Sequence, residues 1–213
     1  MEADNIDGKK EPKRLPVWAC IPLFIVVLFI FIGLYGTLVS GGLSLVLGVE
    51  ARHPGVVGYI FVEASMLLAV LTAAVILLRL ERRPFSDLGL SLKGHASGLW
   101  YGLLMAILLY LLGFGISVVL GEIEVTGFQF KPLDLLGSWV FFLLVALFEE
   151  ILMRGYILGR LLHTNMNKFL ALFISSALFA FMHIFNPEIA FLPMLNLLLA
   201  GMLLGASYPV SYT

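Results

Sequence analysis

Residues 141–160 read FFLLVALFEEILMRGYILGR, a segment that is apolar apart from Glu149, Glu150, Arg154 and the terminal Arg160. A helix needs roughly 20 predominantly apolar residues to cross the hydrocarbon core of a bilayer. Ionisable side chains are costly inside a membrane, so such groups within an apolar span indicate a functional site. The stretch therefore predicts a membrane helix and places the chemistry of the protein on it.

The composition of the whole chain is that of a membrane protein. Hydrophobic residues make up 61% of the 213 residues and charged residues 13%, with a mean hydropathy of +1.03. Soluble domains are roughly half apolar and about a quarter charged, so lipid must cover most of this surface and is an expected partner. The net charge of -1 argues against nucleic-acid binding. The single cysteine, Cys20, excludes a disulfide framework.

Apolar segments recur along the chain and predict an all-α, polytopic transmembrane helical bundle of about six spans. They cover residues 17–38, 56–78, 98–120, part of 132–162, 169–185 and 189–206. Residues 1–14 are polar and are expected to form a cytoplasmic tail, and residues 15–213 a single transmembrane domain.

Lysines and arginines fall mainly on one predicted side of the membrane. The tail, the segment 79–93 and residues 154–168 carry all but Arg52 and Lys131 of the 13 basic residues. Cytoplasmic loops are enriched in such residues, which predicts a multi-pass protein of the cell membrane with both termini cytoplasmic. The segment 79–94 is expected to be a linker whose arginines lie on anionic headgroups.

The charged residues of the long apolar segment can be placed by helical geometry. Glu150 and Arg154 are four residues apart, so they share a helix face and can form an ion pair. Glu149 points about 100° away from Glu150. Residues 163–167 (HTNMN) predict a turn between two antiparallel helices. Glu149 and His183 are symmetric about residue 166, so we expect them at the same depth, roughly 25 Å from the turn.

A carboxylate that faces an imidazole can activate water for hydrolysis. Two other interpretations remain open from the residues alone: a buried polar contact between helices, or a proton relay in a proton-coupled transporter. The sequence shows neither the inverted repeats nor the paired broken helices of many transporters. Glu149, Glu150 and His183 are also a candidate ligand set for a divalent metal such as zinc, although no HExxH motif is present.

Two motifs in adjacent predicted helices carry a family resemblance. EEILMR (149–154) resembles the Glu-Glu-x-x-x-Arg motif of the CAAX protease and bacteriocin-processing family of intramembrane peptidases, and FAFMH (179–183) resembles its Phe-x-x-x-His motif. SDLGL (86–90) is similar to a loop of such proteins, and the resemblance covers roughly residues 80–206.

The resemblance implies an all-helical intramembrane endopeptidase that acts on a peptide or membrane-protein substrate. It makes Glu149 the base and His183 its partner in activating water, and Glu150 and Arg154 complete the first motif. The family pattern continues with a His-x-x-x-Asn motif, whereas no histidine follows His183. The alternative expectation is therefore a C-terminally truncated, catalytically incomplete member that acts as an immunity or scaffold protein.

The last apolar segment and the residues before His183 add further candidates. Phe179 lies one turn before His183, and Asn196 is the single amide of the segment 189–206, so both are candidate pocket residues. Gly201 and Gly205 have the small-xxx-small spacing that predicts a close contact between membrane helices.

Overall fold

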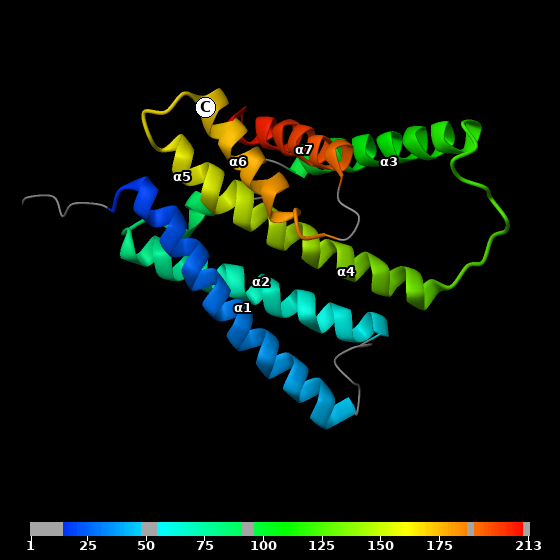
Figure 1. Cartoon of the computed structure of the whole chain (residues 1–213), viewed down its shortest axis with the longest axis horizontal. Helices are drawn as coiled ribbons and strands as arrows, with labels where there is room; N and C mark the ends of the chain where they lie inside the picture. Colours follow the sequence, from blue (N-terminus) through cyan, green and yellow to red (C-terminus); the bar gives the residue numbers. More distant parts are fainter. Residues whose placement is uncertain (1–14, 48–54, 91–95, 187–189, 211–213) are drawn as a thin grey trace, which may run out of the picture.

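The computed structural model describes residues 15–47, 55–90, 96–186 and 190–210, and every regular element in these ranges is helical. The all-α fold is thereby confirmed. The order is α1 (Val17–Leu47), α2 (Gly55–Leu80), the short 3-10 helix η1 (Phe85–Leu88), α3 (Ala96–Val119), α4 (Pro132–Glu150), the π-helix η2 (Ile151–Leu158), α5 (Gly159–Leu162), α6 (Lys168–Met182) and α7 (Phe191–Val210) (Figure 1).

Each of the predicted apolar segments forms a helix, and the chain is a multi-pass membrane protein. In the described ranges, four helical segments are long and apolar enough to cross a membrane: Val17–Leu45, Gly55–Leu80, Trp100–Val119 and Pro132–Leu162. The other two apolar helices, Lys168–Met182 and Phe191–Ala206, are shorter. The 15 residues of α6 rise only about 22 Å, which is less than the hydrocarbon thickness of about 30 Å.

The helices run between two ends of the molecule. The start of α1, the end of α2 and α5 lie at the left of Figure 1, and the start of α2 and of α4 lie at the right. α2 and α4 are parallel, because Val56 lies against Gly137 and Tyr59 meets Phe141 edge to face at 6.3 Å. α1 packs against α2, and α6 against α7.

The segment η2 forms the centre of the packing. All of its residues, Ile151–Leu158, are buried, and it contacts α2, α4, α5, α6, α7 and η1. Phe24 of α1 stacks on Tyr156 with ring centroids 3.8 Å apart. Leu88 of η1 is buried, and a Cβ added to Gly155 would lie 3.0 Å from the carbonyl oxygen of Leu88. The segment after α2 is therefore packed into the protein at η1, rather than lying wholly on the headgroups as expected.

A cluster of buried polar side chains, the Glu81 cluster, joins α1, α2 and α5. The hydroxyl of Tyr156 donates to the Glu81 carboxylate at 2.7 Å, and Arg160 forms an ion pair with the same carboxylate. Arg83 approaches it at 4.0 Å, and Arg160 also donates to the sulfur of Cys20 at 3.9 Å. Glu81 is 3% and Arg160 6% exposed, so these charges are held inside the protein at this end.

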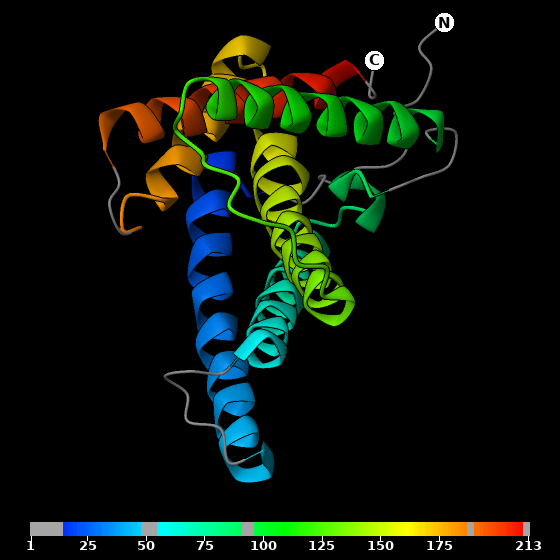
Figure 2. The same cartoon turned by 90° about the vertical axis from the view of Figure 1, so that its right-hand side faces the viewer.

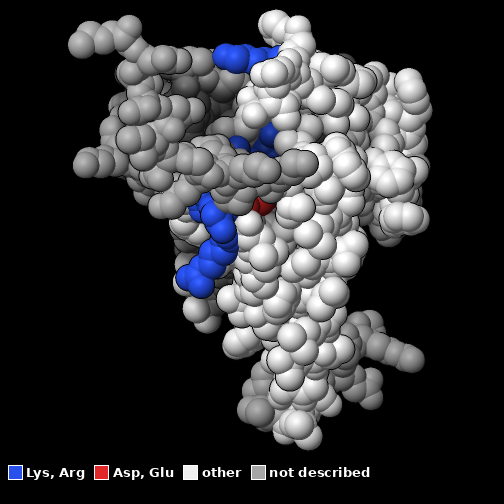
Figure 3. Space-filling view, turned by 90° about the vertical axis from the view of Figure 1, so that its left-hand side faces the viewer, with Lys and Arg blue, Asp and Glu red and all other residues white. Residues whose placement is uncertain are grey.

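The outer surface of the helices is apolar. α3 runs along one side of the molecule at a steep angle to α1 (Figure 2), and none of the window Trp100–Val119 is buried. Figure 3 looks onto the end that holds the start of α1 and α5, where Lys and Arg atoms stand out from a largely uncharged surface. Arg79 and Arg82 are exposed there. The positive charge gathers where the predicted cytoplasmic side places it, and the orientation itself stays a prediction.

Candidate active site

The two adjacent glutamates lie where the α-helical hydrogen bonding of α4 changes. Glu149 is in the last turn of α4, and Glu150 immediately precedes η2. At the end of η2 the amide of Gly159 donates to the carbonyl of Arg154, five residues back. Such wide turns are rare in proteins, and those that occur are often at functional sites. Here the change of phase follows the glutamates directly, so they stay partly exposed while Ile151–Leu158 turns inward.

The hairpin between α5 and α6 brings Glu149 and His183 together. The Asn167 side chain accepts a hydrogen bond from the amide of Phe169 at 2.8 Å and so begins α6. From this turn α6 returns along η2, and the His183 Nε2 atom lies 3.7 Å from Glu149 Oε1. The predicted level pairing is present. His183 lies just beyond the last helical residue, Met182, and not within the helix as expected.

The His183 ring is held in one orientation. Its Nδ1 lies 2.8 Å from the carbonyl oxygen of Phe179, and the Phe179 ring meets it edge to face at 4.8 Å. A carbonyl oxygen can only accept, so Nδ1 carries the hydrogen and Nε2 is the atom turned to Glu149. The 3.7 Å separation exceeds a direct hydrogen bond. A water that donates to both groups would bridge it.

The second glutamate has a different partner. Arg154 Nη1 lies 2.9 Å from Glu150 Oε1, which is the ion pair predicted from their spacing. The Arg154 guanidinium also lies 5.2 Å from the centroid of the Phe179 ring, a cation–π contact. The side chain of Arg154 is 6% exposed and that of Glu150 49%. Glu150 is therefore engaged by the arginine, and Glu149 alone faces the histidine.

Glu149 and His183 line a pocket of about 160 Å³. Its one other polar lining residue is Asn186, and the rest of the wall is apolar: Phe148, Leu152, Met153, Phe179 and Met182. Phe179 is thus in the predicted pocket, whereas Asn196 is exposed on α7 and does not line it. The sequence did not indicate Asn186 as a pocket residue. The one feature that could have suggested it is its position three residues after His183.

α2 places a further carboxylate near this pocket. Glu63 lies one helical turn after Tyr59, which touches Phe141 of α4, and its side chain is half-buried. It is close enough to Glu149 to interact with it electrostatically. The structure therefore adds Glu63 to the acidic surroundings of the site.

The donor set does not match a zinc site. Zinc in proteins takes three or four protein ligands, and no three His, Cys, Asp or Glu side chains are grouped for this among the described residues. Glu150, the third member of the predicted set, is paired with Arg154. Of the described residues at the site, Glu149 and His183 are therefore the pair placed for acid–base chemistry.

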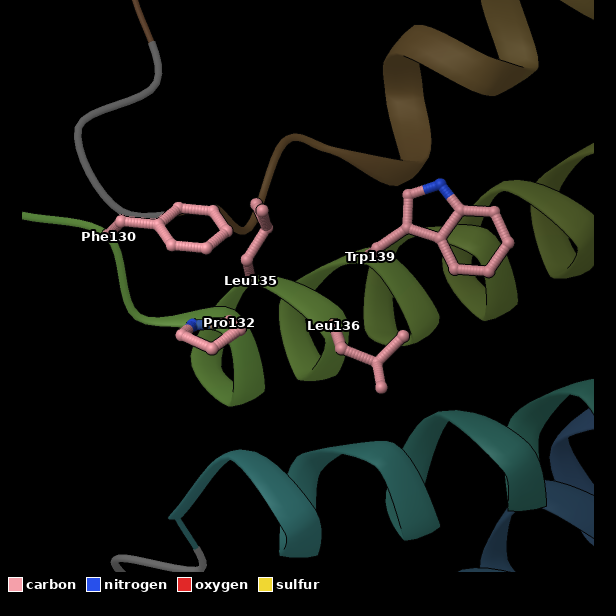
Figure 4. A pocket seen from close by; sticks show the side chains of 5 residues that line it. All are labelled: Phe130, Pro132, Leu135, Leu136 and Trp139. Carbon is pink, nitrogen blue, oxygen red and sulfur yellow. The ribbon is translucent and has the colours of Figure 1, made fainter.

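A larger hollow lies at the start of α4. It measures about 350 Å³ and is lined by Phe130, Pro132, Leu135, Leu136 and Trp139 (Figure 4). None of these side chains can accept or deliver a proton at ordinary pH. The smaller pocket at Glu149 is therefore the candidate active site.

Fold and site together define a multi-pass, all-helical membrane protein with a carboxylate and an imidazole facing each other between two of its helices. Residues 131–211 match the sequence model of the family described as type II CAAX prenyl endopeptidase Rce1-like. The resemblance to CAAX proteases is thereby confirmed over the stretch that contains both motifs, and it points to protease-type enzymes. No curated protein and no solved structure matches the chain.

Proposed function

We propose that the chain is an intramembrane endopeptidase of the CAAX-protease type, which hydrolyses a peptide bond near the C-terminus of a prenylated peptide or membrane protein. The observation that carries the proposal is the approach of Glu149 Oε1 and His183 Nε2 to 3.7 Å on the wall of a pocket. The substrate class comes from the description of the matching family.

In the proposed reaction Glu149 is the general base. It takes a proton from a water molecule as the water oxygen bonds to the scissile carbonyl carbon and the carbonyl electron pair moves onto oxygen. The proton then passes to the leaving amine as the C–N bond breaks. His183, fixed through its Nδ1 to Phe179, orients the water. Positioned acid–base groups of this kind contribute typically ~10²–10⁴ in rate.

The surroundings support this assignment of roles. Phe148, Leu152 and Met182 wall the pocket with apolar groups, and electrostatic interactions are stronger where bulk water is excluded. Glu150 is paired with Arg154 at 2.9 Å, whereas the Glu149 carboxylate faces His183. Glu149 is therefore the carboxylate available for proton transfer.

The test is cleavage of a fluorescent prenylated peptide by the purified chain in liposomes. We expect Glu149→Gln and His183→Ala to lower kcat by about 100-fold or more. The matched control is Glu122→Gln, which changes an exposed glutamate after α3 and should keep the parent rate. If folded Glu149→Gln cleaves as fast as the parent, the peptidase proposal is wrong and the scaffold alternative replaces it. In a proton-coupled transporter, Glu149→Gln would also abolish proton transport, but neither the parent chain nor the variant would release a peptide product.

A further inference from the structure

The pocket that holds Glu149 and His183 contains one polar side chain with no role in water activation, Asn186. A carboxylate oxygen can only accept hydrogen bonds, and His183 donates its Nδ1 hydrogen to the Phe179 carbonyl oxygen. The apolar members of the lining offer no side-chain donor. Among the described residues that line the pocket, the side-chain carboxamide of Asn186 is therefore the group that can donate a hydrogen bond without first taking up a proton.

Asn186 reaches the pocket because α6 ends in a series of tight turns. The backbone amides of His183 and Ile184 donate to the carbonyl oxygens of Ala180 and Phe181 at 3.0 and 3.1 Å, respectively. The backbone amide of Asn186 donates to the carbonyl oxygen of His183 at 3.0 Å. In turns with this i→i+3 pattern, side chains three residues apart lie on the same side. The turn therefore sets the Asn186 side chain beside that of His183.

The place of the Asn186 carboxamide is not explained by a structural contact. The residue is exposed, and within the described ranges its side chain makes no hydrogen bond. Asn167, at the opposite end of α6, differs because its side chain caps the helix through the Phe169 amide at 2.8 Å. Asn186 thus keeps both of its N–H hydrogens for a bound molecule.

On the basis of the proposed hydrolysis, we infer that Asn186 donates a hydrogen bond to the oxyanion formed when water adds to the scissile carbonyl. Negative charge grows on that oxygen as Glu149 removes the water proton. It disappears when the tetrahedral intermediate collapses and the proton reaches the leaving amine. A donor aimed at this oxygen stabilises the transition state more than the bound substrate, and loss of one such donor costs about 10²–10³ in kcat.

The experiment compares Asn186→Ala and Asn186→Leu with the parent chain in liposomes, using the same prenylated peptide. Leu has nearly the shape of Asn, lacks the NH₂ group and adds no charge beside Glu149. We expect both variants to lose about 10²–10³ in kcat with little change in KM and an unchanged Tm, because the side chain is exposed. Asn165→Ala, at an exposed amide in the turn before α6, is the control and should match the parent.

Each other outcome overturns the inference in a distinct way. A rise in KM at constant kcat would make Asn186 a substrate-binding residue. Parent-like kinetics of both variants, with Glu149→Gln inactive, would remove Asn186 from the reaction and leave the proposed function intact. Full activity of Glu149→Gln would remove both the proposed function and the role of Asn186. Should Asn186→Ala lower Tm, the kinetics of the nearly isosteric, uncharged Asn186→Leu decide between a structural and a catalytic role.

Discussion

The substitution Glu81→Gln tests whether the Glu81 cluster holds α1, α2 and α5 together. The Glu81 side chain is 1% exposed and pairs with Arg160, whose side chain is 7% exposed, so solvent screens the pair very little. Glutamine has nearly the same size, and its carbonyl can still accept the 2.7 Å hydrogen bond from Tyr156. The change therefore removes the negative charge and little else.

The expected loss follows from what remains buried. Without the carboxylate, the guanidinium of Arg160 has no counter-ion within the cluster, and its Nε and Nη1 already lack hydrogen-bond partners among the residues that the structure describes. Removal of one partner of a buried ion pair costs about 3–5 kcal/mol. For a chain of this length each kcal/mol lowers Tm by roughly 2–4 °C, so Glu81→Gln should melt about 6–20 °C below the parent.

The assay is thermal unfolding of the purified protein in one detergent. Arg79→Gln, at an exposed residue near the same end of α2, is the control and should stay within about 0.5 kcal/mol of the parent. The double variant Glu81→Gln with Arg160→Met removes both charges, keeps an acceptor for the Tyr156 hydroxyl and should recover most of the loss. A Glu81→Gln protein that melts with the parent would refute the reasoning, because the buried charge would then have found another partner.

Two glycine contacts give further predictions. Gly155→Ala should destabilise the protein by about 1–3 kcal/mol, because the new Cβ would lie 3.0 Å from the carbonyl oxygen of Leu88; Gly113→Ala, which meets nothing within 4 Å, is the control in the same melting assay. Gly201→Val should separate α7 from α6, since its Cβ would lie 3.0 Å from Cβ of Ser176. The measurement is limited proteolysis, and equal protection of α7 in parent and variant would contradict the expected contact.

The site was largely predictable because its geometry follows from helical periodicity. Glu150 and Arg154 meet at 2.9 Å since residues four apart share a helix face. Glu149 and His183 come level because both helices leave the same turn with the same rise per residue. Gly201 also packs on Ser176 as the small-residue spacing indicated. The catalytic roles of these residues stay predictions.

Other parts of the site depend on contacts between distant segments. The π-helical η2 is one example, because α- and π-type hydrogen bonds differ by a single residue in register and its burial on all sides comes from other helices. Asn186 is another, because its place depends on how α6 ends. Tyr156 and Glu81 are 75 residues apart in the chain, so no local pattern indicates that they meet.

The sequence by itself determined the membrane helices, the candidate reactive pair and the Glu150–Arg154 ion pair, because these depend on hydrophobicity and helical spacing within short segments. Only the tertiary structure decided that η1 packs on Gly155, that Asn186 shares the pocket of Glu149, and that Glu81 and Arg160 form a buried ion pair. The physical reason is that these contacts join helices far apart in the chain, and their geometry exists only once the packed helices exclude lipid and water.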